Sequence, residues 1–166
     1  VSQREEAADV FVTIYDYDTG HIEEKKLTGV SGCLSYKSSG RISWINIDGL
    51  RKADVELVCN HFEIHPLFAE DILSTNQRPK MDEADNHLFC LLNMLYYNNE
   101  NRTVEQEQIS IIIGKDYVIS FQEDAKRDVF NPLRDRLRSN NSRIRQRGAD
   151  YLCYNMLDLI IDNYFL

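Results

Sequence analysis

The chain is poor in several features that mark common classes of protein. Its 166 residues include no run of 18 uncharged apolar residues, so we expect no transmembrane helix within it. Basic side chains are also in deficit, with 19 Lys and Arg against 27 Asp and Glu and a net charge of −8. Sequence-independent binding to nucleic acid needs basic groups that replace counterions, so this acidity argues against a nucleic-acid partner.

The cysteines and the first residues give little indication of function. The 4 cysteines form no C-x-x-C pair, and Cys90 and Cys153 lie in apolar segments. We interpret them as buried thiols of a reducing compartment. Arg4-Glu5-Glu6 is not followed by an apolar stretch, so the sequence predicts no secretory signal.

Motifs of catalysis are missing as well. The sequence has no nucleophile elbow, no G-x-x-x-x-G-K-[ST] phosphate loop and no G-x-G-x-x-G dinucleotide motif. We therefore expect a protein that is not an enzyme.

Hydrophobic periodicity and turn residues predict the elements. Strands are expected over residues 9–17, 22–27, 42–47, 87–97, 104–113 and 117–121, and helices over 53–62, from Pro66, over 128–138 and over 146–166. The apolar run in 87–97 indicates a central strand covered on both faces. This order predicts an α/β fold, an α/β/α sandwich around a mixed, largely antiparallel sheet. We expect one domain over 1–148, with 149–166 as the start of a long helix that leaves it.

The run from Ile64 to Lys80 is the most informative segment. Pro66 suits the first turn of a short helix, so Glu70 and Asp71 fall in its last turns, where the helix dipole disfavours carboxylates. Two adjacent acids there need a positive charge nearby. Arg78 in the following loop is one candidate, and a divalent cation is the other.

The final helix carries a second pair of acids. Asp158 and Asp162 stand four residues apart on one face, and Tyr151 and Asn155 continue that stripe. The stripe is either a solvated helix face or part of a cation site. Mg²⁺ prefers oxygen ligands and takes only one or two carboxylates directly, so a sparse site suits its chemistry.

Two other clusters are weaker candidates. His61 and His65 stand at i, i+4, but Pro66 is expected to break the helix between them, and we interpret His65 as a capping residue. The segment 126–147 holds eight basic residues among several acids. We interpret these as solvated helix faces with some ion pairs, and a contact with anionic lipid is the alternative.

An ordered set of short motifs covers about three quarters of the chain. These motifs are Ser43-Trp44-Ile45-Asn46-Ile47, Ile64-His65-Pro66-Leu67, Glu70-Asp71-Ile72-Leu73, Gln77-Arg78-Pro79-Lys80, Glu107-Gln108, Ser120-Phe121-Gln122-Glu123 and Ala149-Asp150-Tyr151-Leu152. In order and spacing the set resembles the N-terminal cytoplasmic domain of the CorA-like magnesium and cobalt channels.

The resemblance implies a regulatory role. It implies that Glu70 and Asp71, with Asp158 and less firmly Asp162, bind regulatory Mg²⁺ (or Co²⁺ or another divalent cation) together with the stalk helix of a neighbouring protomer. It further implies a homopentamer anchored by C-terminal membrane helices outside this chain. This domain would then lie on the cytoplasmic side of a bacterial or archaeal inner membrane. The bound cation would favour the closed state of the channel. The chain alone need not be oligomeric.

Two alternatives stay open at the level of sequence. One is a zinc-transporting member of the same superfamily, which would share the fold. The other is a soluble metal-dependent hydrolase in which Glu70, Asp71 and Asp158 form one site. Membrane spans downstream of this chain would separate a channel from the hydrolase.

Overall fold

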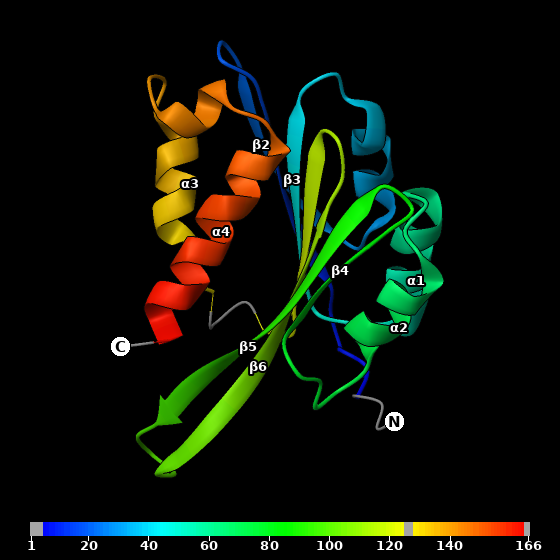
Figure 1. Ribbon diagram of the computed structural model, residues 1–166, viewed down its shortest axis with the longest axis vertical. Coiled ribbons are helices and arrows are strands. Elements are labelled where there is room, and N and C mark those ends of the chain that lie inside the picture. The colour runs from blue at the N-terminus through cyan, green and yellow to red at the C-terminus, as the bar shows by residue number, and fades with distance from the viewer. Residues whose placement is uncertain (1–4, 125–127, 165–166) are drawn as a thin grey trace.

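A single sheet organises the molecule. The structure, a computed structural model, describes residues 5–124 and 128–164. The sheet has seven strands in the order β2-β1-β3-β7-β6-β5-β4 (Figure 1). The strands are β1 (Phe11–Tyr17), β2 (Ile22–Thr28), β3 (Ile42–Asp48), β4 (Lys80–Ala84), β5 (His87–Asn98), β6 (Thr103–Ile113) and β7 (Tyr117–Gln122). Within the described residues, β3 and β7 pair in parallel and the other neighbouring strands pair antiparallel.

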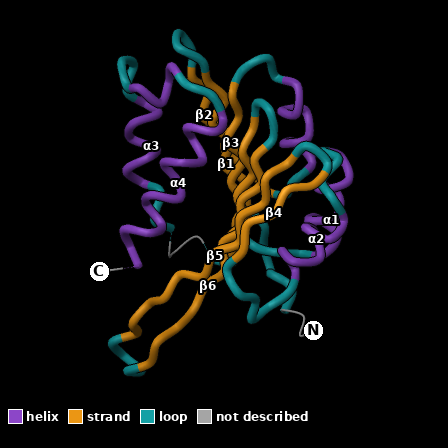
Figure 2. The backbone as a smooth tube through the Cα atoms, viewed as in Figure 1, coloured by secondary structure: helices purple, strands orange, loops and turns teal. Residues whose placement is uncertain are grey.

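Helices cover both faces of the sheet. They are α1 (Lys52–His61), α2 (Pro66–Leu73), α3 (Asn131–Arg138) and α4 (Ala149–Tyr164), with 3-10 turns η1 (Ser31–Ser38) and η3 (Arg143–Gln146). In Figures 1 and 2, α1 and α2 lie on one side of the sheet and α3 and α4 on the other. The predicted α/β/α sandwich with a mixed, largely antiparallel sheet is confirmed.

Each face has its own apolar core. Beneath α1 and α2 the core includes Val58, Phe68 and Ile72. Beneath α3 and α4 it includes Leu133 and Met156. Burial of such side chains stabilises the fold by roughly 1.5–3 kcal/mol each before the entropy cost. The sheet therefore separates the two helical layers.

The predicted strands are present, but one further strand was missed. The consecutive strands β1 and β2 pair as an antiparallel hairpin, as do β6 and β7, whereas β4 (Lys80–Ala84) was not predicted. Its side chains are half-buried or exposed, because an edge strand needs only its main-chain bonds to β5. The prediction that 87–97 is a central strand was wrong, because β5 is second from the edge, next to β4. Its two-sided burial is confirmed, because Phe89 and Cys90 lie in opposite cores.

The last helix begins three residues later than predicted, at Ala149. The 3-10 turn η3 takes the preceding residues and buries Arg145. Along α4, Leu152, Met156 and Ile160 pack in the core against the sheet. The division into a domain over 1–148 and a stalk-leading helix over 149–166 stays a prediction.

Candidate metal centre

Local sequence sets the geometry of α2. His65 is the N-cap, and its Nδ1 accepts a hydrogen bond from the Leu67 N–H at 3.1 Å. Pro66 follows in the first turn, where its missing N–H costs nothing. The helix ends where the Ser74 N–H donates to the Glu70 carbonyl at 3.1 Å. The predicted start of this helix and the capping role of His65 are both confirmed.

The rings of His61 and His65 have separate neighbours. The His61 ring lies 5.5 Å from that of Phe62, and the His65 ring 5.8 Å from that of Phe68. Because His65 Nδ1 is used in capping α2, the pair is explained as local structure rather than as half of a zinc site.

Glu70 is an exposed carboxylate in the last turn of α2. The helix buries Phe68, Ala69 and Ile72, so Glu70 is turned toward solvent. It lines a groove of about 520 Å³ between α1 and α2, which Glu56 and Lys52 also line. Its position at the negative end of the helix dipole makes a nearby cation favourable.

Asp71 has a cationic partner within the chain, but not the one predicted. Its carboxylate forms an ion pair with Lys80 Nζ, and the two side chains are 18% and 38% exposed. Lys80 opens β4, and its ammonium also lies 5.9 Å from the Phe89 ring centroid. The expectation that Arg78 balances the acidic pair was therefore wrong, because the unpredicted strand β4 brings Lys80 beneath the helix end instead.

Two polar residues from the sheet hold the end of α2, and sequence reasoning missed both. Gln108 Nε2 donates to the carbonyls of Asp71 at 3.3 Å and Ile72 at 3.5 Å. Asn93 Nδ2 donates to the Gln77 carbonyl at 2.7 Å in the loop that follows. Both are buried. A polar residue inside an apolar run is a signal that would have found Asn93, whereas Gln108 follows three polar residues and gives no such signal.

Asp158 and Asp162 lie on the other side of the molecule. Both are exposed on α4, which packs against the face of the sheet opposite to α2 (Figure 1). One chain therefore does not bring Asp158 together with Glu70 and Asp71. Over 5–124 and 128–164, no group of three or more His, Cys, Asp or Glu side chains is placed to hold a metal ion.

The rest of the predicted stripe on α4 is only partly exposed. Asn155 is 9% exposed, and its Oδ1 accepts a hydrogen bond from Arg136 at 3.0 Å. Its amide donates to the Tyr151 carbonyl at 2.8 Å. Asn155 thus joins α4 to α3, which leaves the two exposed aspartates as the candidate ligands of the stripe.

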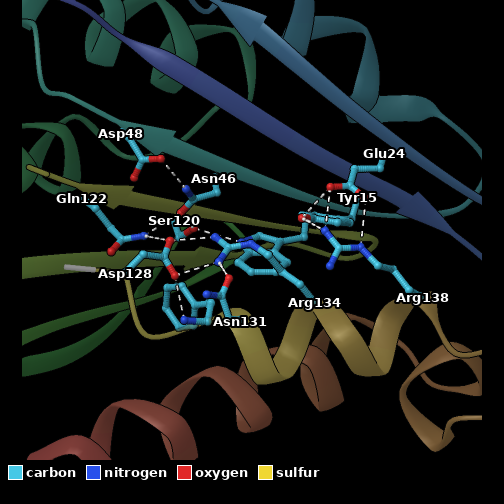
Figure 3. Close-up of polar contacts among 12 residues, drawn as sticks. Tyr15, Glu24, Asn46, Asp48, Ser120, Gln122, Asp128, Asn131, Arg134 and Arg138 are labelled. Atoms are coloured by element: carbon cyan, nitrogen blue, oxygen red, sulfur yellow. Dashed lines mark hydrogen bonds and ion pairs between the residues drawn. The ribbon is translucent and has the colours of Figure 1, made fainter. Parts of the chain in front are cut away.

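Arginines of the basic segment 126–147 form ion pairs and hydrogen bonds within the fold. Arg134 forms an ion pair with Asp128 at 2.6 Å, and Arg138 forms one with Glu24 at 2.8 Å (Figure 3). Arg145 is 3% exposed and donates to the Leu137 carbonyl at 3.1 Å. The predicted ion pairs are confirmed, whereas a solvated position is wrong for Arg145. Lys126 and Arg127 lie outside the described residues.

Comparison with known families decides the relationship. The family model for the CorA-like Mg²⁺ transporter protein matches residues 39–166. The chain belongs to this family. The resemblance identified from the ordered motifs is thereby confirmed.

Relatives of this CorA-family chain carry names in metal-ion transport. It is 40% identical over 159 residues to the cobalt/magnesium transport protein CorA of Thermotoga maritima, a match of 95% of this chain and 45% of that protein. It is 24% identical over 130 residues to a magnesium transporter of Saccharomyces cerevisiae, a match of 78% of this chain and 15% of that protein. The chain spans less than half the length of these relatives.

Solved structures share the fold of the CorA-family chain. The soluble domain of CorA from Methanocaldococcus jannaschii aligns with a TM-score of 0.63 at 15% identity, over 92% of this chain and 56% of that one. The cytoplasmic domain of ZntB from Vibrio parahaemolyticus aligns with a TM-score of 0.54 at 13% identity, over 92% of this chain and 57% of that one. Among the described residues, no helix is both long and apolar enough to cross a membrane.

Proposed function

We propose that this chain is the cytoplasmic Mg²⁺-sensing domain of a CorA-like divalent-cation channel. A cation binds at Glu70 and Asp71 of one protomer, against the stalk of its neighbour, and favours the closed state. The observation that carries the proposal is the position of Glu70, an exposed carboxylate at the negative end of α2. A cation there stabilises the helix end as well as the carboxylate.

The arrangement of the acids supports a site shared between copies. Glu70 and Asp71 lie on one side of the sheet, and Asp158 and Asp162 on the other. Because the sheet lies between the two pairs, a ligand set larger than two carboxylates needs groups from another copy. Mg²⁺ keeps several waters and takes one or two carboxylates directly, so each pair suits it as a partial site.

Lys80 tunes this site. Its ammonium already neutralises Asp71, so a cation at Asp71 competes with Lys80, while Glu70 is the readier ligand. Such competition weakens binding to the isolated chain and fits a sensor of an abundant ion such as Mg²⁺. Co²⁺ or another divalent cation, with the same charge, would bind the same carboxylates.

The regulatory mechanism is thermodynamic linkage. A cation that binds better between protomers of a closed, symmetric ring than of an open one shifts the population toward closed. When the cation leaves, carboxylates face one another across each interface and repel. We propose a pentameric ring on the cytoplasmic side of a bacterial or archaeal inner membrane, with membrane helices outside this chain.

The alternatives are less well supported. A hydrolase site made of Glu70, Asp71 and Asp158 in one chain does not fit, because the sheet separates α2 from α4. The named relatives are transporters, which favours a function other than catalysis. The zinc alternative keeps one observation in its favour, the likeness of the fold to the ZntB cytoplasmic domain.

Mg²⁺ titration of two forms of the protein tests the shared site. By isothermal titration calorimetry, the 166-residue chain is expected to bind Mg²⁺ weakly, and the full-length assembly at least tenfold more tightly. Glu70→Gln with Asp71→Asn should remove the difference, while the control Glu100→Gln, an exposed residue of the β5–β6 turn, should keep it. Equal affinity in the chain and the assembly would contradict a site shared between copies.

A further inference from the structure

A buried polar network joins β3 and β7 beneath α3 (Figure 3). Trp44 Nε1 donates to Ser120 Oγ at 2.9 Å, and Ser120 Oγ donates to Asn46 Oδ1 at 2.6 Å. The Gln122 amide donates to Asn46 Oδ1 at 3.0 Å and to Asp128 Oδ2 at 3.1 Å. Both amide hydrogens of Gln122 are thus directed at acceptors, which fixes the orientation of its amide.

The network ends in two oxygens without a donor. Asn46 Nδ2 donates to Asp48 Oδ2 at 3.1 Å, but Asp48 Oδ1 and Gln122 Oε1 have no hydrogen-bond partner among the described residues. Asp48 is 9% exposed and Gln122 is fully buried. Buried polar atoms are nearly always paired in hydrogen bonds, so a donor is missing at this end of the network.

The two unpartnered oxygens belong to neighbouring residues. Asp48 and Gln122 are direct partners in the parallel β3–β7 register, and adjacent strands lie about 4.8 Å apart. Their side chains are on the same face as that of Asn46, toward α3. A protonated carboxyl group has a hydrogen to donate, which the ionised form lacks.

The charges around Asp48 favour its neutral form. Burial raises the pKa of Asp48 from its ordinary 3.8 to about 6, against the hydrogen bond from Asn46, which lowers it. The negative charges of Asp128 and Asp124 add to the rise, and Arg134 opposes it. Arg134 is itself paired with Asp128, so little positive charge is left for Asp48.

We propose that Asp48 is a proton-binding site, in which the neutral acid donates its Oδ1–H to Gln122 Oε1. The proton links the carboxyl ends of β3 and β7. Through the hydrogen bond from Gln122 to Asp128, it also helps to hold the N-terminal end of α3 against the sheet. Loss of the proton leaves a buried carboxylate oxygen with no donor. The site is independent of Glu70 and Asp71, which lie on the other face of the sheet.

The direction of the pH effect follows from the raised pKa. Because folding raises the pKa of Asp48 from 3.8 to about 6, the stabilisation by this proton is complete below pH 3.8. It is lost as the pH rises through about 6, and above that both states are ionised and the effect is constant. A folded-state pKa about two above the unfolded-state pKa corresponds to about a 100-fold change in the unfolding constant.

A direct titration and a matched variant test the proposal. In the 166-residue chain, the ¹³C carboxyl resonance of Asp48, assigned by its loss in Asp48→Asn, should titrate with a midpoint near 6. Asp48→Asn supplies a permanent donor, so the ratio of the wild-type to the variant unfolding constant should rise about 100-fold from pH 3 to pH 7 and then level off. The control Asp116→Asn, at an exposed turn residue, should show a ratio independent of pH.

Three outcomes would overturn the proposal. One is a carboxyl midpoint below 4.5, and another is a flat ratio for Asp48→Asn. The third is a midpoint that falls by more than half a pH unit when EDTA is replaced by 10 mM Mg²⁺, which would assign the two oxygens to a metal ion instead of a proton.

Discussion

Lys80 Nζ forms an ion pair with the carboxylate of Asp71 below the C-terminal end of α2. The pair joins the first residue of an edge strand to the last turn of a helix that covers one face of the sheet. It neutralises one of two adjacent carboxylates and leaves Glu70 exposed. The proposed cation site therefore contains a competitor within its own chain.

Removing that competitor should strengthen cation binding. In Lys80→Gln, Asp71 becomes available as a ligand. Because a partly exposed ion pair is worth up to about 1 kcal/mol, we expect Co²⁺ or Mg²⁺ to bind the full-length protein about fivefold more tightly. Calorimetric titration measures this change. Arg78→Gln is the control, because Arg78 is exposed and Asp71 pairs with Lys80 in its place. Unchanged or weaker binding in Lys80→Gln would contradict the competition.

Gln108 should stabilise the end of α2. Its amide donates to the carbonyls of Asp71 and Ile72, and Gln108→Ala leaves both without this donor. We expect the free energy of unfolding in urea to fall by about 1–2 kcal/mol. Gln106→Ala, at an exposed position of the same strand, should change it by less than about 0.5 kcal/mol. Equal effects of the two substitutions would argue against the capping role.

The ion pair between Arg134 and Asp128 should matter more than the other arginine contacts. The two side chains are 13% and 11% exposed, and the guanidinium also lies 5.4 Å from the Trp44 ring centroid. Arg134→Leu leaves the Asp128 carboxylate without its ion-pair partner in a mostly buried site. The expected loss is about 3 kcal/mol of unfolding free energy.

Thermal unfolding checks this loss against a matched variant. Arg143→Leu changes the same residue type at an exposed position and should leave the midpoint within about 1–2 °C of the wild type. A loss below about 1 kcal/mol in Arg134→Leu would mean that the pair is screened like a surface pair.

Glu24 gives a pH dependence of the opposite sign to that of Asp48. The hydrogen bonds from Arg138 lower the pKa of Glu24 below its ordinary 4.5. The stabilisation by this pair is therefore present above pH 4.5 and is lost as the pH falls through the lower, folded-state pKa. Glu24→Gln should destabilise the chain more at pH 7 than at pH 3, and Glu100→Gln should destabilise it at neither pH. An equal loss at the two pH values would show that shape, not charge, is responsible.

Features set by neighbours in the sequence were predictable. Pro66 has a fixed backbone angle and no N–H, so the start of α2 and the cap by His65 follow from local chemistry. The acidic pair at the end of that helix follows in the same way. Alternation and apolar runs also sufficed for most strands, because burial on a sheet face imposes a period of two residues.

Features that depend on distant parts of the chain were not predictable in this way. Lys80 reaches Asp71 only because β4 pairs with β5, and the polar side chains of β4 give no strand signal. Gln108 reaches the end of α2 from a strand 36 residues away. The position of Asp158 on the face opposite to Glu70 follows from the order of the strands, which no local pattern records.

Inhibition of ion flux by internal Mg²⁺ tests the central claim most directly. For this test, a full-length protein that contains this chain is reconstituted in liposomes, and Mg²⁺ uptake is followed as internal Mg²⁺ is raised. With Glu70→Gln, Asp71→Asn and Asp158→Asn combined, we predict that half-inhibition needs at least tenfold more internal Mg²⁺ than in the wild type, with Glu100→Gln as the unaffected control. An unchanged inhibition curve in the triple variant would contradict the assignment of this domain as the Mg²⁺ sensor.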